Sequence, residues 1–259
     1  KSFAGPTYHT ALWPHEKVVF SGKRVAVIGT GSSAIQSIPQ IAREASHLTV
    51  FQRTPNYAIP AHNREMDPEL EKAIKTHYPT MRARAKTTPG GLDVVYNQGS
   101  IHDATPDERN SAFEGNWQRG GLGFMSAYGD LMMDQSANEI AAEFVRNKIR
   151  ERVKDPQTAE RLCPRNVIGA KRLCVDIGYY ETYNRDNVDL VDVGAAPIEK
   201  ITPEGVRAHG RLYKVDALII ATGFDAMTGA LTRVDIRGRK DVSLAERWKD
   251  GPSTYLGLA

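Results

Sequence analysis

The stretch GKRVAVIGTGSSAIQSIPQIAREASHLTVFQRT, residues 22–54, decides the fold. Its apolar run Arg24–Ile28 is typical of a strand buried on both faces of a parallel sheet. A turn follows, and apolar residues then recur every three or four positions, which predicts an amphipathic helix that begins near Ser32. Pro39 lies inside this helix and predicts a kink rather than its end. A second apolar run, His47–Phe51, completes a strand–helix–strand unit.

The turn between strand and helix has the pattern G-x-G-x-x-A of dinucleotide-binding sites. Gly29 allows the tight turn, Gly31 lets a pyrophosphate approach the backbone, and the small Ala34 lets helix and strand pack closely. The helix N-terminus offers free N–H groups and a positive dipole end to the phosphates. The expected cofactor-binding residues here are Gly29, Thr30, Gly31, Ser32, Ser33, Ala34, Ile35 and Gln36. The alternative is a glycine-rich turn that binds nothing.

The end of the second strand indicates which dinucleotide binds. An NAD-preferring site usually has Asp or Glu about 20 residues beyond the glycines, where the carboxylate holds the ribose 2′-hydroxyl. This chain has Gln52-Arg53-Thr54 there and no carboxylate. A guanidinium and a hydroxyl bind a 2′-phosphate, which a carboxylate would repel. We therefore predict NADP(H) as the cofactor, with Arg53 and Thr54 among its ligands; the alternative for Arg53 is a solvated surface arginine.

The composition excludes several classes of function. The 259 residues suffice for more than one structural unit, and 41% apolar and 25% charged residues are typical of a soluble globular protein. A net charge of +3 favours neither nucleic acid nor a membrane surface as partner. No apolar run is long enough to span a bilayer, and no signal peptide is recognised. Cys163 and Cys174 lack metal-ligand spacing, so we expect no metal site, reduced thiols and a cytoplasmic location.

Residues 61–165 predict a helical insertion. We expect a charged helix over Asp67–Lys86, with Leu70, Ile74 and Met81 among its apolar positions, broken by Pro89-Gly90-Gly91. An irregular stretch then runs to about Gly129, with Phe113 and Trp117 as packing anchors, and a helix to about Lys154 is introduced by a capping box of Ser136 and Glu139.

Sheet-forming segments return after Val167. The expected segments are a strand or its entry at Lys171–Val175, a short helix at Ile177–Tyr183, a strand at Val188–Val191, a β-meander over residues 198–213 and a strand at Val215–Ala221. The predicted fold class is therefore α/β: a Rossmann-like dinucleotide-binding domain with a parallel sheet, a β-meander and a helical insertion.

The N-terminal residues 1–22 are rich in glycine, proline and aromatic side chains, which favours a connection pinned between two domains rather than an element of its own. They contain the pattern F-x-G-x-x-x-H-x-x-x-W-P, whose fixed positions are Phe3, Gly5, His9, Trp13 and Pro14. Placed directly before G-x-G-x-x-A, this pattern resembles the fingerprint of the type I Baeyer–Villiger monooxygenases. These flavoproteins use NADPH and O2 to insert oxygen beside a ketone carbonyl. The resemblance continues at residues 51–55, 169–173 and 221–225, and is to the phenylacetone- and cyclohexanone-type enzymes in particular.

The resemblance implies a portion of a larger flavoprotein with two dinucleotide domains. It implies a division into residues 1–22 as interdomain linker, 23–60 and 166–222 as NADP-binding domain, 61–165 as helical insertion and 223–259 as the start of a return to the FAD domain. FAD would be bound mainly outside this chain, by segments of the same enzyme, and a ketone and O2 would be the substrates. The sequence has no second G-x-G-x-x-G and no initiator Met, as expected for such a portion.

The resemblance also implies site residues at Lys171 and Arg172. Arg172 is the expected catalytic residue and a cofactor ligand, because a permanent guanidinium would stabilise the negative charge that develops beside the flavin. Alternation along a strand would direct Lys171 and Arg172 opposite ways, one to the 2′-phosphate and the other to the flavin. The alternative is an ordinary surface basic pair. We expect His9 to couple the domains as part of a hinge, or else to be a buried histidine with satisfied hydrogen bonds.

Two other functions stay open. A flavin monooxygenase that oxygenates amine nitrogen or sulfur shares the two-domain plan, but there the motif ends differently from Trp13-Pro14 and the Lys171-Arg172 pair is not expected. The chain by itself is alternatively an NADP(H)-binding module without turnover. Flavin absorbance of the purified protein, and product analysis with a ketone and NADPH, discriminate between these functions.

Overall fold

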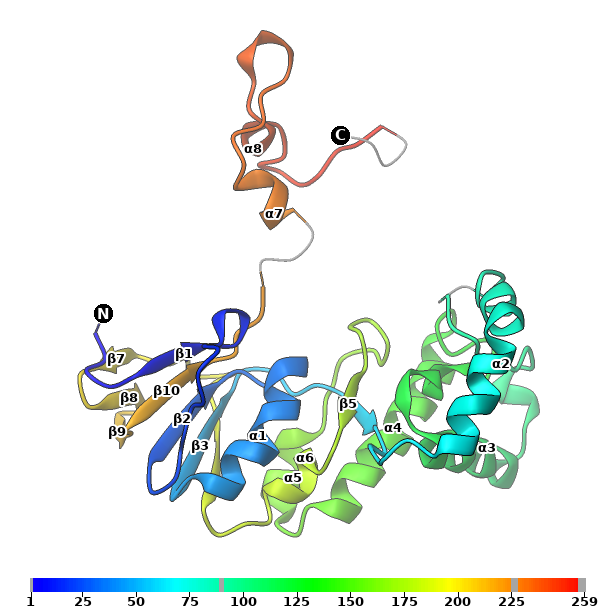
Figure 1. The fold of residues 1–259 in the computed structure, drawn as a ribbon, viewed down its shortest axis with the longest axis horizontal. Helices are drawn as coiled ribbons and strands as arrows, with labels where there is room; N and C mark the ends of the chain where they lie inside the picture. The colour runs from blue at the N-terminus through cyan, green and yellow to red at the C-terminus, as the bar shows by residue number, and fades with distance from the viewer. Residues whose placement is uncertain (1, 89–90, 225–227, 256–259) are drawn as a thin grey trace. The chain divides into compact units, whose positions relative to one another are not determined.

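The computed structural model describes residues 2–88, 91–224 and 228–255. It divides into two compact units, Lys1–Thr222 and Gly223–Ala259. The larger unit contains the sheets and the long helices (Figure 1). Pro89 and Gly90 of the expected helix break, and Asp225 of the segment that resembles the monooxygenases, lie outside the described residues.

A five-stranded parallel sheet forms the centre of the larger unit, in the order β1-β10-β2-β3-β6. Every neighbouring pair is parallel, so the carboxyl ends of all five strands meet at one edge. The strands are β1 Thr7–His9, β2 Arg24–Ile28, β3 His47–Gln52, β6 Val188–Asp192 and β10 Ala217–Ile220. The predicted α/β class with a parallel sheet is confirmed.

Alternate residues of the strands face two different apolar layers. One layer includes α1 (Ser32–Glu44), and the other includes the β-meander. The strand residues in the layer with α1 include Val25, Val27, Leu48 and Val50, and those in the layer with the meander include Ala26, Phe51 and Leu218. Burial on both faces explains why these strands appear in the sequence as unbroken apolar runs.

Helix α1 lies along the sheet (Figure 1) and buries the face predicted from its apolar spacing. The buried residues are Ala34, Ile35, Ile38, Pro39, Ile41 and Ala42. The helix continues through Pro39 to Glu44, as predicted, although proline cannot donate a bond to the carbonyl one turn earlier.

The predicted β-meander is also confirmed. It consists of β7 Lys200–Thr202, β8 Gly205–Ala208 and β9 Arg211–Lys214, paired antiparallel. The ring of Tyr213 meets the ring of Phe51 edge to face, with centroids 5.2 Å apart, so the meander packs directly on β3.

The N-terminal segment differs from the expected connection, because Thr7–His9 forms strand β1 at the edge of the sheet, parallel to β10. Phe3 is buried in the same apolar layer as the meander. A Cβ on Gly5 would lie 2.8 Å from the Phe3 ring and 2.9 Å from the Asp216 carbonyl oxygen, so glycine permits this close approach. Local composition favoured a loop here, and pairing with a strand about 210 residues later in the chain overrides that preference.

Residues 61–165, the predicted insertion, include four α-helices in the part that the structure describes: α2 Pro68–Ala85, α3 Pro106–Arg119, α4 Gln135–Arg152 and α5 Pro156–Leu162. Helix α2 agrees with the prediction. The prediction of an irregular stretch up to Gly129 is wrong in part. Helix α3 lies within this stretch and begins with a capping box of Thr105 and Glu108. Phe113 and Trp117 are buried as predicted. They are the only buried residues of α3, so its apolar spacing was too sparse to predict a helix.

The predicted capping box at the start of α4 is wrong. The N-cap is Asp134, whose Oδ1 accepts the N–H of Ala137 at 2.8 Å, and Ser136 lies inside the helix. Both residues are good caps, and Asp134 additionally accepts a bond from the Ser136 hydroxyl at 2.6 Å. The helix ends at Arg152, close to the predicted Lys154.

A separate two-stranded sheet joins the insertion to the sheet domain. It pairs β4 Ala58–Pro60 in parallel with β5 Cys174–Asp176, and α6 Tyr179–Thr182 follows. The strand predicted at Lys171–Val175 thus begins later, and Lys171 and Arg172 precede it. Alternation along a strand therefore does not govern the directions of these two side chains.

The described residues of the smaller unit form two short α-helices, α7 Gly229–Thr232 and α8 Leu244–Arg247. The described ranges also contain short 3-10 turns: η1 Thr10–Leu12, η2 Ile101–Asp103, η3 Gly121–Ser126 and η4 Arg239–Asp241.

Gly29→Ala tests the strand contact at the first glycine of the turn. Gly29 has φ +109°, and a Cβ there would lie 2.3 Å from the Ala221 carbonyl oxygen, so the substitution adds backbone strain and a clash. A cost of at least about 2 kcal/mol should lower the Tm by roughly 4–8 °C in differential scanning calorimetry. Gly31→Ala is the control, because Gly31 has an ordinary φ of −83° and a Cβ would meet nothing within 4 Å. Equal Tm values for the two variants would contradict this account.

Candidate functional site

The site is the carboxyl edge of the parallel sheet, where β2 meets β10. From β2 the chain proceeds to β3 and β6 on one side, whereas β10 and β1 lie on the other side. Ligands of open α/β sheets bind in the crevice at such a reversal of strand order. The turn Gly29-Thr30-Gly31 leaves β2 at this point and leads into α1.

The first turn of α1 presents backbone donors. Gly31 is the N-cap and has no side-chain capping bond, and the space beside it is open. Ser32, Ser33 and Gln36 are exposed at this end, whereas Ala34 and Ile35 are buried against the sheet. Unpaired N–H groups and the positive end of the helix dipole make this end suited to an anion such as a pyrophosphate.

Two hydrogen bonds tie the turn to the segment that follows β3. The Thr30 hydroxyl donates to the Thr54 carbonyl oxygen at 3.1 Å, and Asn56 Nδ2 donates to the Thr30 carbonyl oxygen at 2.7 Å. Sequence reasoning missed Asn56, because no local pattern links it to a turn 26 residues earlier.

Arg53 and Thr54 directly follow β3 at the same edge of the sheet. The Arg53 side chain is exposed, and among the described residues its guanidinium has no hydrogen-bond or ion-pair partner. The β6–β7 connection crowds its backbone, since a Cβ on Gly194 would lie 2.7 Å from the Arg53 carbonyl oxygen. The guanidinium is therefore available to an anionic ligand beside the turn.

Lys171 and Arg172 lie in an exposed segment before β5. This segment reaches the turn through Cys174, whose Sγ lies 3.2 Å from the hydroxyl oxygen of Ser32 at the start of α1. Burial raises the pKa of the Cys174 thiol, although the Ser32 contact and the Arg172 charge act in the opposite direction. Within the described residues, no hydrogen bond or ion pair joins Lys171 or Arg172 to another expected site residue.

Asp176, at the end of β5, links this segment to the insertion. Its carboxylate accepts the N–H of Tyr179, and Arg152 of α4 lies 3.3 Å away. Burial raises the pKa of Asp176, while the backbone bond and the Arg152 charge favour the ionised form. The Arg152 guanidinium also lies over the Trp117 ring, 5.0 Å from its centroid, so one side chain connects α3, α4 and β5.

The N-terminal motif also reaches the carboxyl edge. His9 is the last residue of β1, is half-buried, and accepts the N–H of Ala11 on its Nδ1 at 3.1 Å. Trp13 packs on Tyr8 and Phe20, with ring centroids 5.5 Å and 6.4 Å away, and the half-buried Pro14 follows. Phe3 and Gly5 lie near the other end of β1.

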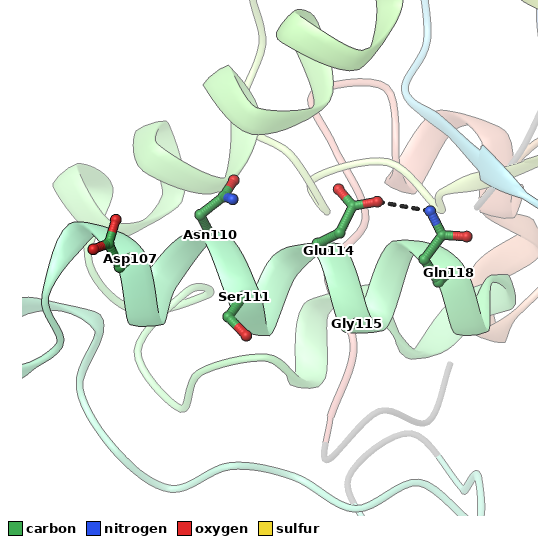
Figure 2. Close-up of a pocket in the computed structure, with 6 residues that line it drawn as sticks. All are labelled: Asp107, Asn110, Ser111, Glu114, Gly115 and Gln118. Atoms are coloured by element: carbon green, nitrogen blue, oxygen red, sulfur yellow. Dashed lines mark hydrogen bonds between the residues drawn. The ribbon is translucent and has the colours of Figure 1, made fainter.

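Five hollows in the described part of the chain are lined by residues other than the expected site residues. Figure 2 shows one of about 550 Å³ along α3, where Glu114 accepts a bond from Gln118 at 2.7 Å. Its lining is polar and comes from that single helix. Across the described ranges, no group of three or more His, Cys, Asp or Glu side chains is placed to hold a metal ion. No helix in those ranges has the length and apolar content needed to cross a membrane.

No protein-family model matches the chain, but individual relatives match almost all of it. It is 44% identical, over 99% of its length, to the 2-oxo-Δ3-4,5,5-trimethylcyclopentenylacetyl-CoA monooxygenase of Pseudomonas putida, of which it covers 49%. It is 42% identical to a Baeyer–Villiger monooxygenase of Pseudooceanicola batsensis, matching 99% of this chain and 47% of that protein. It is 38% identical to a phenazine N-monooxygenase of Lysobacter antibioticus, matching 99% of this chain and 48% of that protein.

Solved structures agree with these relatives. A crystal structure of OTEMO in complex with FAD and NADP superposes with a TM-score of 0.95 at 44% identity, over 99% of this chain and 49% of that one. An oxidised steroid monooxygenase bound to NADP superposes with a TM-score of 0.92 at 47% identity, over 99% of this chain and 49% of that one. The chain spans about half the length of the relatives it matches. It is therefore homologous, along nearly its whole length, to about half of a Baeyer–Villiger monooxygenase.

Proposed function

We propose that this chain is the NADP(H)-binding part of an FAD- and NADPH-dependent Baeyer–Villiger monooxygenase. The enzyme would insert one oxygen atom of O2 next to a ketone carbonyl and release an ester or a lactone. The observation that carries the proposal is the G-x-G-x-x-A turn at the reversal of strand order between β2 and β10, with an uncapped helix N-terminus and, beside it, Arg53, whose guanidinium has no partner among the described residues. The similar solved structures that contain NADP support it.

The proposal includes the division of the chain derived from the sequence. Residues 23–60 and 166–222 would bind NADP(H), residues 61–165 would form an insertion, and residues 1–22 and 223–259 would connect to a domain that holds FAD. The split of the structure at Thr222 and Gly223 supports the last boundary. The remaining FAD-domain segments would be the partners of this chain. Two free, buried thiols support a cytoplasmic location.

The residues present fit NADP(H) because the site combines donors with positive charge. The pyrophosphate would bind the N–H groups at the start of α1, and the 2′-phosphate would bind Arg53, Thr54 and Lys171. Arg172 would supply the permanent positive charge beside the flavin. When bound, FAD supplies the redox and oxygen-activating chemistry, for which this chain holds and orients the nicotinamide cofactor.

A second candidate function is the oxygenation of an amine nitrogen, because one relative is a phenazine N-monooxygenase at 38% identity. The products separate the two functions: the full-length protein, supplied with NADPH and cyclohexanone, should form the lactone. Formation of an N-oxide from phenazine, with no ester or lactone from any ketone, would favour the second function.

Arg53→Ala should reduce the affinity for NADPH and leave that for NADH nearly unchanged. Each charge-assisted hydrogen bond to the 2′-phosphate contributes roughly 1.5–3 kcal/mol, or about one to two decades of affinity. Isothermal titration calorimetry on the full-length protein measures both dissociation constants. Arg185→Ala is the matched control, because Arg185 precedes the amino end of β6, away from the carboxyl edge. Equal losses for NADPH and NADH would mean that Arg53 has a structural role.

Arg172→Ala should separate NADPH oxidation from oxygen insertion. Without the guanidinium, the full-length protein is expected to oxidise NADPH slowly and to form no ester or lactone. Lys171→Ala is the comparison, since loss of a 2′-phosphate ligand should raise the KM for NADPH but preserve ester formation per NADPH consumed. NADPH consumption and product are measured together, by absorbance at 340 nm and gas chromatography. Ester formation at the wild-type rate in Arg172→Ala would contradict the assignment.

A further inference from the structure

The carbonyl of Thr30, in the middle of the turn, is held by a side chain from outside the turn. Asn56 lies four residues beyond the end of β3 and donates from its Nδ2 to this carbonyl at 2.7 Å. The side chain of Thr30 is buried, and its hydroxyl makes the bond to Thr54. The segment that carries Arg53 therefore fixes the turn through both the backbone carbonyl and the side-chain hydroxyl of Thr30.

The backbone of Asn56 is in turn fixed by the core. Its carbonyl oxygen accepts from the hydroxyl of Tyr180 at 3.3 Å, and the same hydroxyl accepts the N–H of Ala58 at 3.2 Å. Tyr180 is fully buried in α6. The amide of Asn56 thus projects from a rigid support, which is the condition for one side chain to orient another segment accurately.

We propose that Asn56 is a positioning residue for the pyrophosphate of the dinucleotide, an inference that rests on the function proposed above. The peptide between Thr30 and Gly31 is planar and trans, so its N–H points opposite to its C=O. Because Asn56 holds the carbonyl, the N–H of Gly31 is directed away from Asn56. The space beside Gly31 is open, since a Cβ there would meet nothing within 4 Å.

Without Asn56 this peptide is free to rotate. Gly31 accepts positive and negative φ about equally well, so flipping the Thr30–Gly31 peptide meets little resistance at that residue. A flipped peptide presents a carbonyl oxygen to the pyrophosphate in place of an N–H, and the two negative groups repel each other. The bond from Asn56 keeps the turn in the binding orientation before the ligand arrives.

The test compares three probes on the full-length protein by isothermal titration calorimetry: NADP+, NAD+ and 2′-AMP, which has the 2′-phosphate but no pyrophosphate. Asn56→Ala should weaken NADP+ and NAD+ binding about tenfold each, the effect of one hydrogen bond, and leave 2′-AMP binding unchanged. Arg53→Ala should change the affinities in a different pattern: NADP+ and 2′-AMP should bind more weakly, and the affinity for NAD+ should be unchanged.

Asn187→Ala is the matched control. Asn187 Nδ2 also donates to backbone carbonyls, those of Ala42 at 3.0 Å and Ala45 at 2.9 Å, but at the opposite end of α1. This variant should lower the Tm and leave the affinities for all three probes unchanged. If Asn56→Ala does not fold, Asn56→Gln takes its place and should give the same split, because the extra methylene displaces the amide.

Two results would overturn the role of Asn56: equal weakening of all three probes, or unchanged affinities for NADP+ and NAD+. A wild-type protein that binds none of the three probes would instead overturn the proposed cofactor, so the two failures are distinguishable.

Discussion

The close approach of the chain after β2 to the chain after β10 determines where the turn and the start of α1 lie. Gly29, at the end of β2, passes so near the carbonyl of Ala221, beyond β10, that a Cβ would lie 2.3 Å from that oxygen. The hydrogen-bonded pairing of β2 with β10 brings these backbones together at the point where the order of the sheet reverses, and only glycine fits there. The chain then turns sharply into α1, so the uncapped N-terminus of the helix lies at this edge of the sheet.

The helical insertion supports the same edge from outside the sheet. Arg152 joins α4 to Asp176 and Glu181, and its guanidinium stacks on Trp117. Asp176 follows closely after Arg172, and Cys174 lies between them in contact with Ser32. The insertion therefore fixes strand β5, which Lys171 and Arg172 precede and which contacts the start of α1 through Cys174.

The sequence predicts those parts of the fold whose signals are local. The β2–α1–β3 unit was predicted because its strands are buried on both faces and its helix has one apolar face, which leaves clear periodicities. Strand β1 is not predicted, because its edge pairing depends on β10, whereas the glycine and proline residues that flank it favour a loop. Helix α3 was missed because only two of its side chains are buried.

The same distinction applies to the site. The glycines, Arg53 and Thr54 follow a spaced motif, whereas Asn56, Cys174 and Tyr180 act through hydrogen bonds to residues 26, 142 and 124 positions away. No pattern of neighbouring residues records such pairs, so they emerge only from the structure.

The central claim is that the turn after β2 holds the pyrophosphate of NADP(H). Hydrogen–deuterium exchange of the full-length protein, with and without saturating NADP+, tests it most directly. Bound pyrophosphate should slow exchange in peptides that cover residues 29–36 and leave the β-meander, residues 200–214, unchanged. Unchanged exchange across residues 29–36 in a protein that binds NADP+ would contradict the claim.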